Sequence, residues 1–410
     1  MKTKTNKTAL IPKLRFPEFK NTGVWEVKKL GDMLIKNTRK NKDNKYHLIE
    51  SVSNKYGFVK QDDFFDKRVA SKDTRNYYVI DKGTFAYNPS RIDVGSLAYK
   101  DEGNVSIISP LYVSFKVNND FIIDKYLLFW FKTEDFAFQR QLFTEGGVRN
   151  TLSFENLKKI KLPIPTLPEQ QKIADFLSNL DEWLAAEEEK LTLLETYKKG
   201  LLQNLFPAEG ETVPKLRFPE FQNSGAWEET FLSQVADYEN GKAHEREIED
   251  IGNFIVVNSK FISSDGEEKK YTNKALCPAQ KGDILMVLSD VPNGKAIAKC
   301  FLVEENNRYT VNQRICRIIP QSLNSKILYY LLNRNPYFLA FDDGVKQTNL
   351  RKEDVLNCPL LIPKNQKEQQ KIADCLSALD EQIEAQRQKV ELLKQHKKGL
   401  LQNLFPKFEF

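Results

Sequence analysis

Cationic and amide side chains gather in a few polar segments of this 410-residue chain, and their chemistry suits a polyphosphate partner. Lysine and arginine neutralise phosphates, while Arg, Asn and Gln can form paired hydrogen bonds with base edges. The densest segment, residues 36–45, has the sequence KNTRKNKDNK. A solvated charged surface would also explain any one of these residues taken singly. We predict that the nucleic-acid contacts are made by Lys36, Arg39, Lys40, Lys42, Arg91, Arg149, Asn150, Lys242, Arg246, Arg314, Lys346 and Gln347.

Two of these groups share an order of residue types. Arg149–Asn150–Thr151 and Lys346–Gln347–Thr348 each present a cation, an amide and a hydroxyl shortly before a long helical stretch. Such residues either contact nucleic acid or cap the helix that follows. The sequence favours neither interpretation.

The chain shows no motif that predicts catalysis. It lacks the phosphate-binding pattern G-x-x-x-x-G-K-[ST] and the dinucleotide pattern G-x-G-x-x-G. His47, His244 and His396 stand far apart, which predicts neither a metal cluster nor a triad. Residues 87–90, YNPS, lack the second proline and the aromatic residue of the Asn-Pro-Pro-aromatic loop of amino-methyltransferases, so we predict a turn. We expect no catalytic residue, no metal ligand and no cofactor in this chain.

Two long stretches, which are near copies, must position the other elements. Residues 169–207 and 368–406 match at a constant offset of 199 residues. Apolar residues recur in alternating steps of four and three, a mean spacing of 3.5 that places them in one narrow seam along a helix. The seam positions are Ile173, Leu177, Leu180, Leu184, Glu187, Leu191, Leu194, Lys198, Leu201 and Leu205, then Ile372, Leu376, Leu379, Ile383, Gln386, Val390, Leu393, Lys397, Leu400 and Leu404.

A seam this narrow must be covered by another helix, and the other copy is the nearest candidate. The pattern therefore predicts a coiled coil between the two copies within the chain. Glu187 and Gln386 are the central polar positions, and antiparallel pairing would place them side by side. The alternative is two unrelated amphipathic helices, each packed on its own domain. The identical ends and the unbroken register argue against that alternative.

The repeat extends beyond the helices. The sequence PKLRFPEF occurs at residues 12–19 and again at 214–221, and Trp25 and Trp227 follow at matching positions. We predict that each Trp pins its arm to the start of the next block. The predicted segments are an N-terminal arm at 1–19, a first block at 20–162, a first helix at 163–207, a linker with the repeated arm at 208–221, a second block at 222–360 and a second helix at 361–410.

The two blocks differ strongly in sequence, but both have the signals of mixed α/β domains. Proline-containing segments at 162–165 and 361–363 are predicted to be extended, with their prolines stopping regular structure just before each long helix. The fold class is therefore α+β, with an internal pseudo-two-fold repeat of block and helix. The predicted elements are strands at 83–87, 111–117, 254–257, 284–288 and 315–319, turns at 81–83 and 280–282, and short helices at 125–138 and 326–340.

The charge distribution permits a polyanionic partner. The whole chain carries +6; residues 169–199 carry −4 and residues 368–398 are neutral, which leaves +10 for the rest.

Five scattered cysteines without metal-ligand spacing are typical of a reducing compartment. The longest apolar run is far too short to cross a membrane, and the N-terminus has no signal-peptide pattern. We expect a cytoplasmic protein.

Taken together, these features resemble the specificity subunits of type I restriction–modification systems. The resemblance rests on the arm PKLRFPEF, the segment LPIPTLPEQQKIADFL, and two variable blocks, each followed by a helix that opens with EQQKIAD and closes with KKGLLQNLFP. It implies two target-recognition domains, each reading one half of a bipartite double-stranded DNA target, spaced by an antiparallel coiled coil. It also implies two modification (methyltransferase) subunits that bind S-adenosylmethionine, restriction subunits that use ATP and Mg, and no active site in this chain.

Two other classes of protein are distinguishable from this one by experiment. A nuclease or methyltransferase fused to its own recognition domains would be active as an isolated chain. A coiled-coil scaffold without DNA affinity would fail to bind a duplex even with its partner subunit present.

Overall fold

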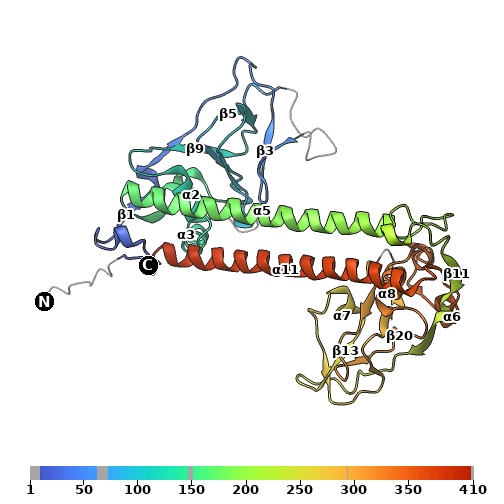
Figure 1. The fold of residues 1–410 in the computed structure, drawn as a ribbon. Coiled ribbons are helices and arrows are strands. Elements are labelled where there is room, and N and C mark those ends of the chain that lie inside the picture. The colour runs from blue at the N-terminus through green and yellow to red at the C-terminus, as the bar shows by residue number, and fades with distance from the viewer. Residues whose placement is uncertain (1–9, 62–72, 146–150, 293, 408–410) are drawn as a thin grey trace. The chain divides into compact units, whose positions relative to one another are not determined.

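The structure, a computed structural model, describes residues 10–61, 73–145, 151–292 and 294–407. The chain folds into two compact units. Unit 1 comprises Met1–Glu188 and Gln388–Phe410, and unit 2 comprises Glu189–Arg387. Each unit contains one variable block together with part of each long helix, α5 (Leu167–Leu205) and α11 (Gln366–Leu404), which Figure 1 labels.

Unit 1 is built around an antiparallel four-stranded sheet of order β2-β9-β6-β7, with the smaller strand pairs β3–β4, β5–β8 and β1–β10. Its strands are β1 Glu26–Lys29, β2 Leu34–Lys36, β3 Glu50–Ser53, β4 Gly57–Lys60, β5 Tyr78–Ile80, β6 Thr84–Tyr87, β7 Leu97–Lys100, β8 Ser106–Ile108, β9 Val113–Val117 and β10 Lys161–Ile164. Its helices, besides α5 and α11, are η1 Pro17–Phe19, η2 Leu30–Asp32, η3 Ile92–Val94, α2 Asp124–Trp130, α3 Glu134–Phe143 and α4 Phe154–Lys159.

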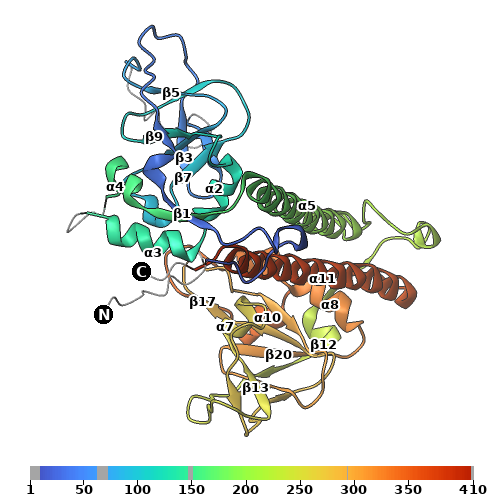
Figure 2. The same cartoon turned by 90° about the vertical axis from the view of Figure 1, so that its left-hand side faces the viewer.

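One hydrophobic core continues from the sheet of unit 1 into the long helices. Phe85 on β6 stacks on Phe115 on β9 with ring centroids 5.2 Å apart, and Trp130 on α2 is fully buried. Figure 2 shows β3, β5, β7 and β9 gathered in one body, with α2 at the end nearest α5. Because the core is shared, moving the block on the helices would expose apolar surface. The residues of the long helices in this core are Ile173, Ala174, Leu177, Leu180, Leu393, Leu400 and Leu404.

Unit 2 repeats this plan with a sheet of order β12-β20-β16-β18 and adds a mixed sheet of order β14-β13-β19-β15, in which β13 and β19 are parallel. Its strands are β11 Glu228–Phe231, β12 Ala236–Asn240, β13 Phe254–Val257, β14 Tyr271–Thr272, β15 Pro278–Ala279, β16 Ile284–Val287, β17 Ser289–Asp290, β18 Cys300–Leu302, β19 Tyr309–Val311, β20 Ile315–Pro320, β21 Thr348–Asn349 and β22 Pro359–Ile362. Its helices are η4 Pro219–Phe221, α6 Leu232–Val235, α7 Ser259–Ser263, α8 Ser325–Leu332, α9 Pro336–Leu339 and α10 Lys352–Leu356.

Helix α8 connects the block of unit 2 to the long helix. It lies between α11 and the sheet that contains β12 and β20 (Figures 1 and 2), and the hydroxyl of Tyr330 donates to Asp380 on α11 at 2.6 Å. Ile327, Leu328 and Leu332 of α8 are fully buried. As in unit 1, the block and the long helices share one core.

The predicted strands are confirmed, but the two predicted short helices are each broken in two. Thr133 separates α2 from α3, because its hydroxyl accepts the N–H of Phe136 and caps α3. Asn335 similarly caps α9, and Pro336 takes the first helical position, where a missing N–H costs nothing. The spacing of apolar residues alone does not reveal these capping residues.

The prediction that prolines interrupt regular structure at 162–165 is wrong. Pro163 lies within β10, opposite Val27 of β1, and its carbonyl accepts the hydroxyl of Tyr126 at 2.9 Å. In the same way β22 pairs with β11 in unit 2. In a two-stranded sheet both strands are edge strands, so a proline there need not remove a hydrogen bond between the strands.

The predicted seam is the least exposed side of both long helices, and within each unit the two helices run antiparallel. In unit 1, Asp181 pairs with Lys397 and Glu187 with Lys389, so the partner number falls as the α5 number rises. In unit 2, Glu195 pairs with Arg387 and Lys198 with Asp380, in the same sense. The buried apolar seam residues of unit 2 are Leu201, Leu205, Ile372, Leu376, Leu379 and Ile383.

The two central polar positions fall in different units. Glu187 in unit 1 accepts the ammonium of Lys389 at 2.6 Å and the indole N–H of Trp183 at 2.9 Å. Gln386 in unit 2 is buried. Their pairing with each other stays a prediction.

Each arm is tied to the start of a long helix by the same buried ion pair. In unit 1 the Arg15 guanidinium donates two hydrogen bonds of 2.7 Å to Glu169, and Trp25 donates its indole N–H to the same carboxylate. Both side chains of the ion pair are at most 6% exposed. The hydrogen bond from Arg15 to Glu169 is the main cause that raises the pKa of Arg15. The predicted role of the tryptophan as an anchor is confirmed, but its link to the helix was not foreseen.

Unit 2 reproduces this clamp. Arg217 donates to Glu368 at 2.7 and 2.8 Å, and Trp227 donates its indole N–H to Glu368. The arms also bind helix ends, since Leu14 N–H donates to the carbonyl of Asn403 and Leu216 N–H to that of Asn204. The two units therefore share one internal scaffold.

Removing one member of this ion pair tests how much the scaffold depends on it. Arg15→Ala leaves Glu169 buried without its cation, which typically costs about 3–5 kcal/mol. We expect thermal and urea unfolding of the full chain to show a loss of that size, and a similar loss for Arg217→Ala. The control is Arg75→Ala, which removes an exposed pair with Asp73 and should cost less than about 1 kcal/mol. Equal losses for the buried and exposed pairs would contradict the clamp.

Candidate nucleic-acid interface

In unit 2 the predicted cations meet at one edge of the block. The N–H of Gly241 donates to the carbonyl of Ile315, and the N–H of Lys242 to that of Val311. A Cβ on Gly241 would lie 2.0 Å from the carbonyl oxygen of Asn312, so only glycine permits this approach. The close contact places exposed Lys242 beside the turn 312–314, which carries exposed Arg314.

A fully buried histidine holds Lys242 in place. His244 Nδ1 lies 2.6 Å from the carbonyl oxygen of Lys242, and Nε2 lies 3.0 Å from the hydroxyl of Thr310. A carbonyl can only accept, so Nδ1 carries the proton; Thr310 already accepts the N–H of Cys277 and can donate to Nε2. His244 is thus a buried core histidine that fixes the turn carrying Arg246.

The loop with Lys346 and Gln347 joins the same edge. Leu288 N–H donates to the carbonyl of Arg314, and the next strand, β17, pairs with β21, which follows Gln347 directly. Asp343 accepts the N–H groups of Val345 and Lys346, which lowers the pKa of this carboxyl. Lys346 and Gln347 are both exposed. We name Lys242, Arg246, Arg314, Lys346 and Gln347 the unit 2 edge.

The unit 2 edge also contains polar side chains that sequence reasoning missed. Gln313 and Asn349 are exposed beside the predicted cations, and Gln313 donates to Glu245 at 2.9 Å. Exposed Lys295 lies in a loop closed by Asp290, whose carboxylate accepts the N–H groups of Ala296 and Ile297. In the sequence, the only signal for Gln313 is its position directly before Arg314. Amides between cations are suited to base edges.

In unit 1 two of the predicted cations, Arg39 and Lys40, lie over tyrosine rings. The carbonyl of Arg39 accepts the N–H of Val79, so the basic segment runs beside β5. The ammonium of Lys40 lies 3.1 Å from the ring centroid of Tyr78, and the guanidinium of Arg39 lies 5.5 Å from that of Tyr46. Arg39 also lies 3.6 Å from Asp81, which offsets part of its charge.

A buried amide shapes the tip of this loop. Asn41, 2% exposed, donates to the carbonyl of Tyr46 and accepts the Tyr46 N–H, while Asn44 adopts a positive φ of 52°. Lys42 is exposed at this tip. The amide-rich composition thus supports the turn as well as any contact with a ligand.

The remaining predicted residues of unit 1 lie near one another around residues 152–154. The ammonium of Lys36 lies 5.6 Å from the ring centroid of Phe154, and the carbonyl of Pro89, two residues before Arg91, accepts the N–H of Leu152. Arg149 and Asn150 lie outside the described residues. We name Lys36, Arg39, Lys40, Lys42 and Arg91 the unit 1 edge.

The alternative capping role is not supported for the second of the two related loops. The N–H of Arg351, at the start of α10, is bound by Asp354, and neither Lys346 nor Gln347 contributes that bond. In unit 1 the cap of α4 is Ser153, which accepts the N–H of Asn156. The helices that follow directly are α4 and α10, not the long helices.

The chemistry of the buried thiols does not suggest a nucleophile. Burial raises the pKa of Cys277 to about 11 and those of Cys316 and Cys358 to about 12, so these thiols stay protonated near neutral pH.

Within residues 10–61, 73–145, 151–292 and 294–407, no group of three His, Cys, Asp or Glu side chains could hold a metal ion. Over the same residues, no helix combines the length and apolarity that crossing a bilayer requires.

Comparison with known proteins gives a consistent result. The type I restriction modification DNA specificity domain matches the chain twice, over residues 22–196 and 225–395. The type I restriction enzyme MjaVIII specificity subunit of Methanocaldococcus jannaschii is 25% identical over 320 residues, 73% of each protein.

Solved structures show a similar fold. The type I restriction–modification S subunit from M. genitalium matches 98% of this chain and 100% of its own, with a TM-score of 0.63 at 15% identity. A chain solved to describe complex assembly and conformational transition of the type I R-M system matches 93% of this chain and 97% of its own, with a TM-score of 0.54 at 16% identity.

Salt dependence tests whether the unit 2 edge contacts phosphates. Each phosphate contact contributes about 0.9 to the slope of log affinity against log salt for a duplex. We expect the double variant Lys242→Gln and Arg314→Gln to lower that slope by about 2 on a duplex of arbitrary sequence. The control, Lys260→Gln and Arg308→Gln, removes cations that already pair with Glu268 and Glu305 in the same unit. An unchanged slope in the first variant would remove the edge from the interface.

Proposed function

The chain belongs to the type I restriction modification DNA specificity family, and from that premise we propose that its two blocks each read one half of a bipartite DNA target. Its relatives are specificity subunits, and the chain is accordingly a non-catalytic DNA specificity protein. The observation that carries the proposal is the repetition of one scaffold with two different edges. A repeated scaffold serves the same partners twice, whereas different edges distinguish different bases.

The two edges occupy corresponding places in their sheets. In unit 1, Asn37 N–H donates to Ser114 on β9, and in unit 2, Gly241 N–H donates to Ile315 on β20. In both units these residues directly follow an edge strand, β2 or β12, of sheets with the same strand order. Unit 1 presents cations stacked on tyrosines there, and unit 2 presents cations with exposed amides. We propose that this difference gives each half-site its own sequence.

The long helices would act as the spacer between half-sites. Each has 39 residues, which gives a length of about 58 Å at about 1.5 Å per residue. In the proposed arrangement they form an antiparallel coiled coil about a pseudo-two-fold axis. Half-sites on one face of a duplex lie about 34–36 Å apart, so each block would fold back over the DNA.

The proposal assigns the chemistry to partner subunits in the cytoplasm. Modification subunits would supply S-adenosylmethionine for adenine methylation, and restriction subunits would use ATP and Mg.

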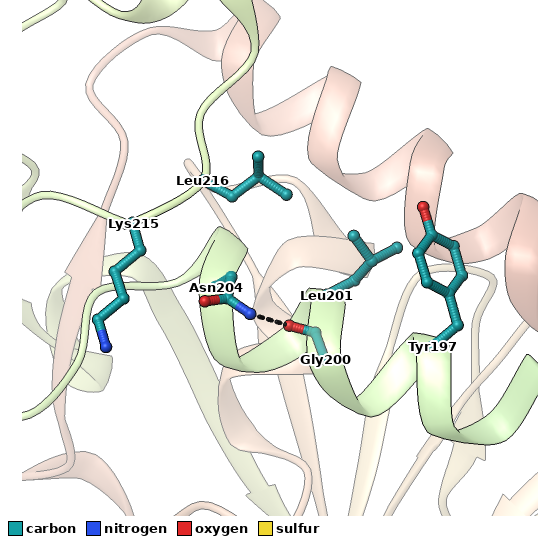
Figure 3. Close-up of a pocket in the computed structure, with 6 residues that line it drawn as sticks. All are labelled: Tyr197, Gly200, Leu201, Asn204, Lys215 and Leu216. Atoms are coloured by element: carbon teal, nitrogen blue, oxygen red, sulfur yellow. Dashed lines mark hydrogen bonds between the residues drawn. The ribbon is translucent and has the colours of Figure 1, made fainter. Parts of the chain in front are cut away.

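A duplicated apolar surface supports docking of two copies of one partner. In unit 2 a groove of about 510 Å³ lies beside the C-terminal end of α5 (Figure 3). Its lining residues are Tyr197, Gly200, Leu201, Asn204, Lys215 and Leu216.

Unit 1 exposes the counterparts of two apolar residues from this region. Leu193, four residues before the groove residue Tyr197, is 62% exposed, and its counterpart Leu392 is 65% exposed in unit 1. Leu216 is 46% exposed on the second arm, and Leu14 is 45% exposed on the first. Large apolar side chains grouped in this way mark protein interfaces. Two equal surfaces predict two equal modification subunits.

Exchanging one block tests the division of the target. Replacing residues 20–162 with the first block of a relative should change one half-site and leave the other unchanged, because the shared scaffold stays intact. The measurement is mapping of adenine methylation in a genome that expresses the chimera with its modification subunit. The converse exchange of residues 222–360 is the matched control. A chimera that altered both half-sites would refute independent reading.

Charged substitutions test the docking surfaces. Leu193→Asp should weaken binding of one modification subunit by about tenfold or more, Leu392→Asp that of the other, and the double variant both, because each buries a charge in an apolar contact. The control is Thr192→Asp, which adds the same charge at an exposed position on another side of α5. Subunit ratios are measured by mass spectrometry of the intact complex. Full two-subunit occupancy in the double variant would exclude these surfaces.

A further inference from the structure

We propose that four charged residues beside the seam make α5 and α11 select each other and reject the same helix of a second copy of the chain. They are Glu188 and Glu195 on α5, and Arg387 and Lys394 on α11. This selection is a property of the helices alone, and it does not depend on the DNA function proposed above.

The four residues form two ion pairs, one in each unit. In unit 1, Glu188 lies 2.7 Å from the ammonium of Lys394. In unit 2, Glu195 lies 3.0 Å from the guanidinium of Arg387. The 199-residue offset relates Glu188 to Arg387 and Glu195 to Lys394. Equivalent positions of the two helices therefore carry opposite charge.

The seam itself cannot make this selection. Leu177 corresponds to Leu376, Leu180 to Leu379, and the other apolar seam positions also carry Leu, Ile or Val in both copies. An antiparallel pair of two α5 helices, or of two α11 helices, would thus bury nearly the same apolar side chains. Only residues that differ between the copies can discriminate.

Two other ion pairs between the helices are neutral in this choice. Asp181 pairs with Lys397 in unit 1, and Asp380 pairs with Lys198 in unit 2. The offset relates the two aspartates to each other and the two lysines to each other. A pair of identical helices would keep these contacts, so they favour antiparallel register without choosing a partner.

The four named residues behave in the opposite way. In a pair of α5 helices in the same register, Glu188 of one copy would face Glu195 of the other, twice. In a pair of α11 helices, Arg387 would face Lys394, also twice. Like charges at such flanking positions reject a pairing, and opposite charges accept it. The side chains are 47–53% exposed, so the effect is screened by salt.

A double charge reversal tests the proposal on the full chain. Glu188→Lys with Arg387→Glu keeps the net charge, makes both ion pairs within the chain repulsive, and makes both pairings of identical helices attractive. At low ionic strength we expect a lower melting temperature and an association constant for dimers on the order of tenfold above that of the unmodified chain. Light scattering after gel filtration gives the mass, and the increase should fall at high salt.

Reversing all four charges provides the control. Glu188→Lys, Glu195→Lys, Arg387→Glu and Lys394→Glu together restore attraction within the chain and repulsion between identical helices, so this variant should match the unmodified chain in mass and melting temperature. Unchanged association in the double variant would overturn the proposal. So would association of the fourfold variant, or a double variant that loses stability without associating, because the charges would then stabilise the helices without choosing their partner.

Discussion

Burial of one narrow apolar seam is the constraint on which the rest of the structure depends. Both long helices are charged outside the seam, and a helix with such a pattern is not stable alone in water. Within each unit the seam is covered from two directions, by the facing helix and by the core of the block. Seam residues in contact with a block, such as Leu177 and Leu376, are fully buried, whereas Leu184 and Leu191 are half-buried.

The buried arginine–glutamate clamps complete this scaffold and explain how the blocks vary. Arg15 precedes Glu169 by 154 residues, while Arg217 precedes Glu368 by 151, yet both pairs are 2.7 Å apart. The two repeats therefore differ by a net three residues in this interval without a change at the clamp. Each block is held at both ends, by the arm before it and the helix after it, so its loops can change independently.

The functional consequence is a division between shared and variable surfaces. Identical contacts recur at the clamps and where each arm binds a helix end, and matching apolar side chains are exposed in both units. The sheet edges differ, since one presents Lys40 on the ring of Tyr78 and the other presents Arg314 beside Gln313. Charges beside the seam differ as well, and there the difference distinguishes the two helices from each other.

Local patterns in the sequence by themselves determined the long helices, their seam, the main strands and the family, because these follow from the spacing of residue types along a continuous stretch. The tertiary structure decided what depends on residues far apart in the chain. It paired Arg15 with Glu169, made β10 a strand despite Pro163, and brought Arg314, Lys242 and Lys346 to one edge. No local sequence pattern predicts these contacts, because they depend on the strand order of the sheets. They also depend on Gly241, whose missing side chain permits a close backbone approach, and on the hydrogen bonds of His244.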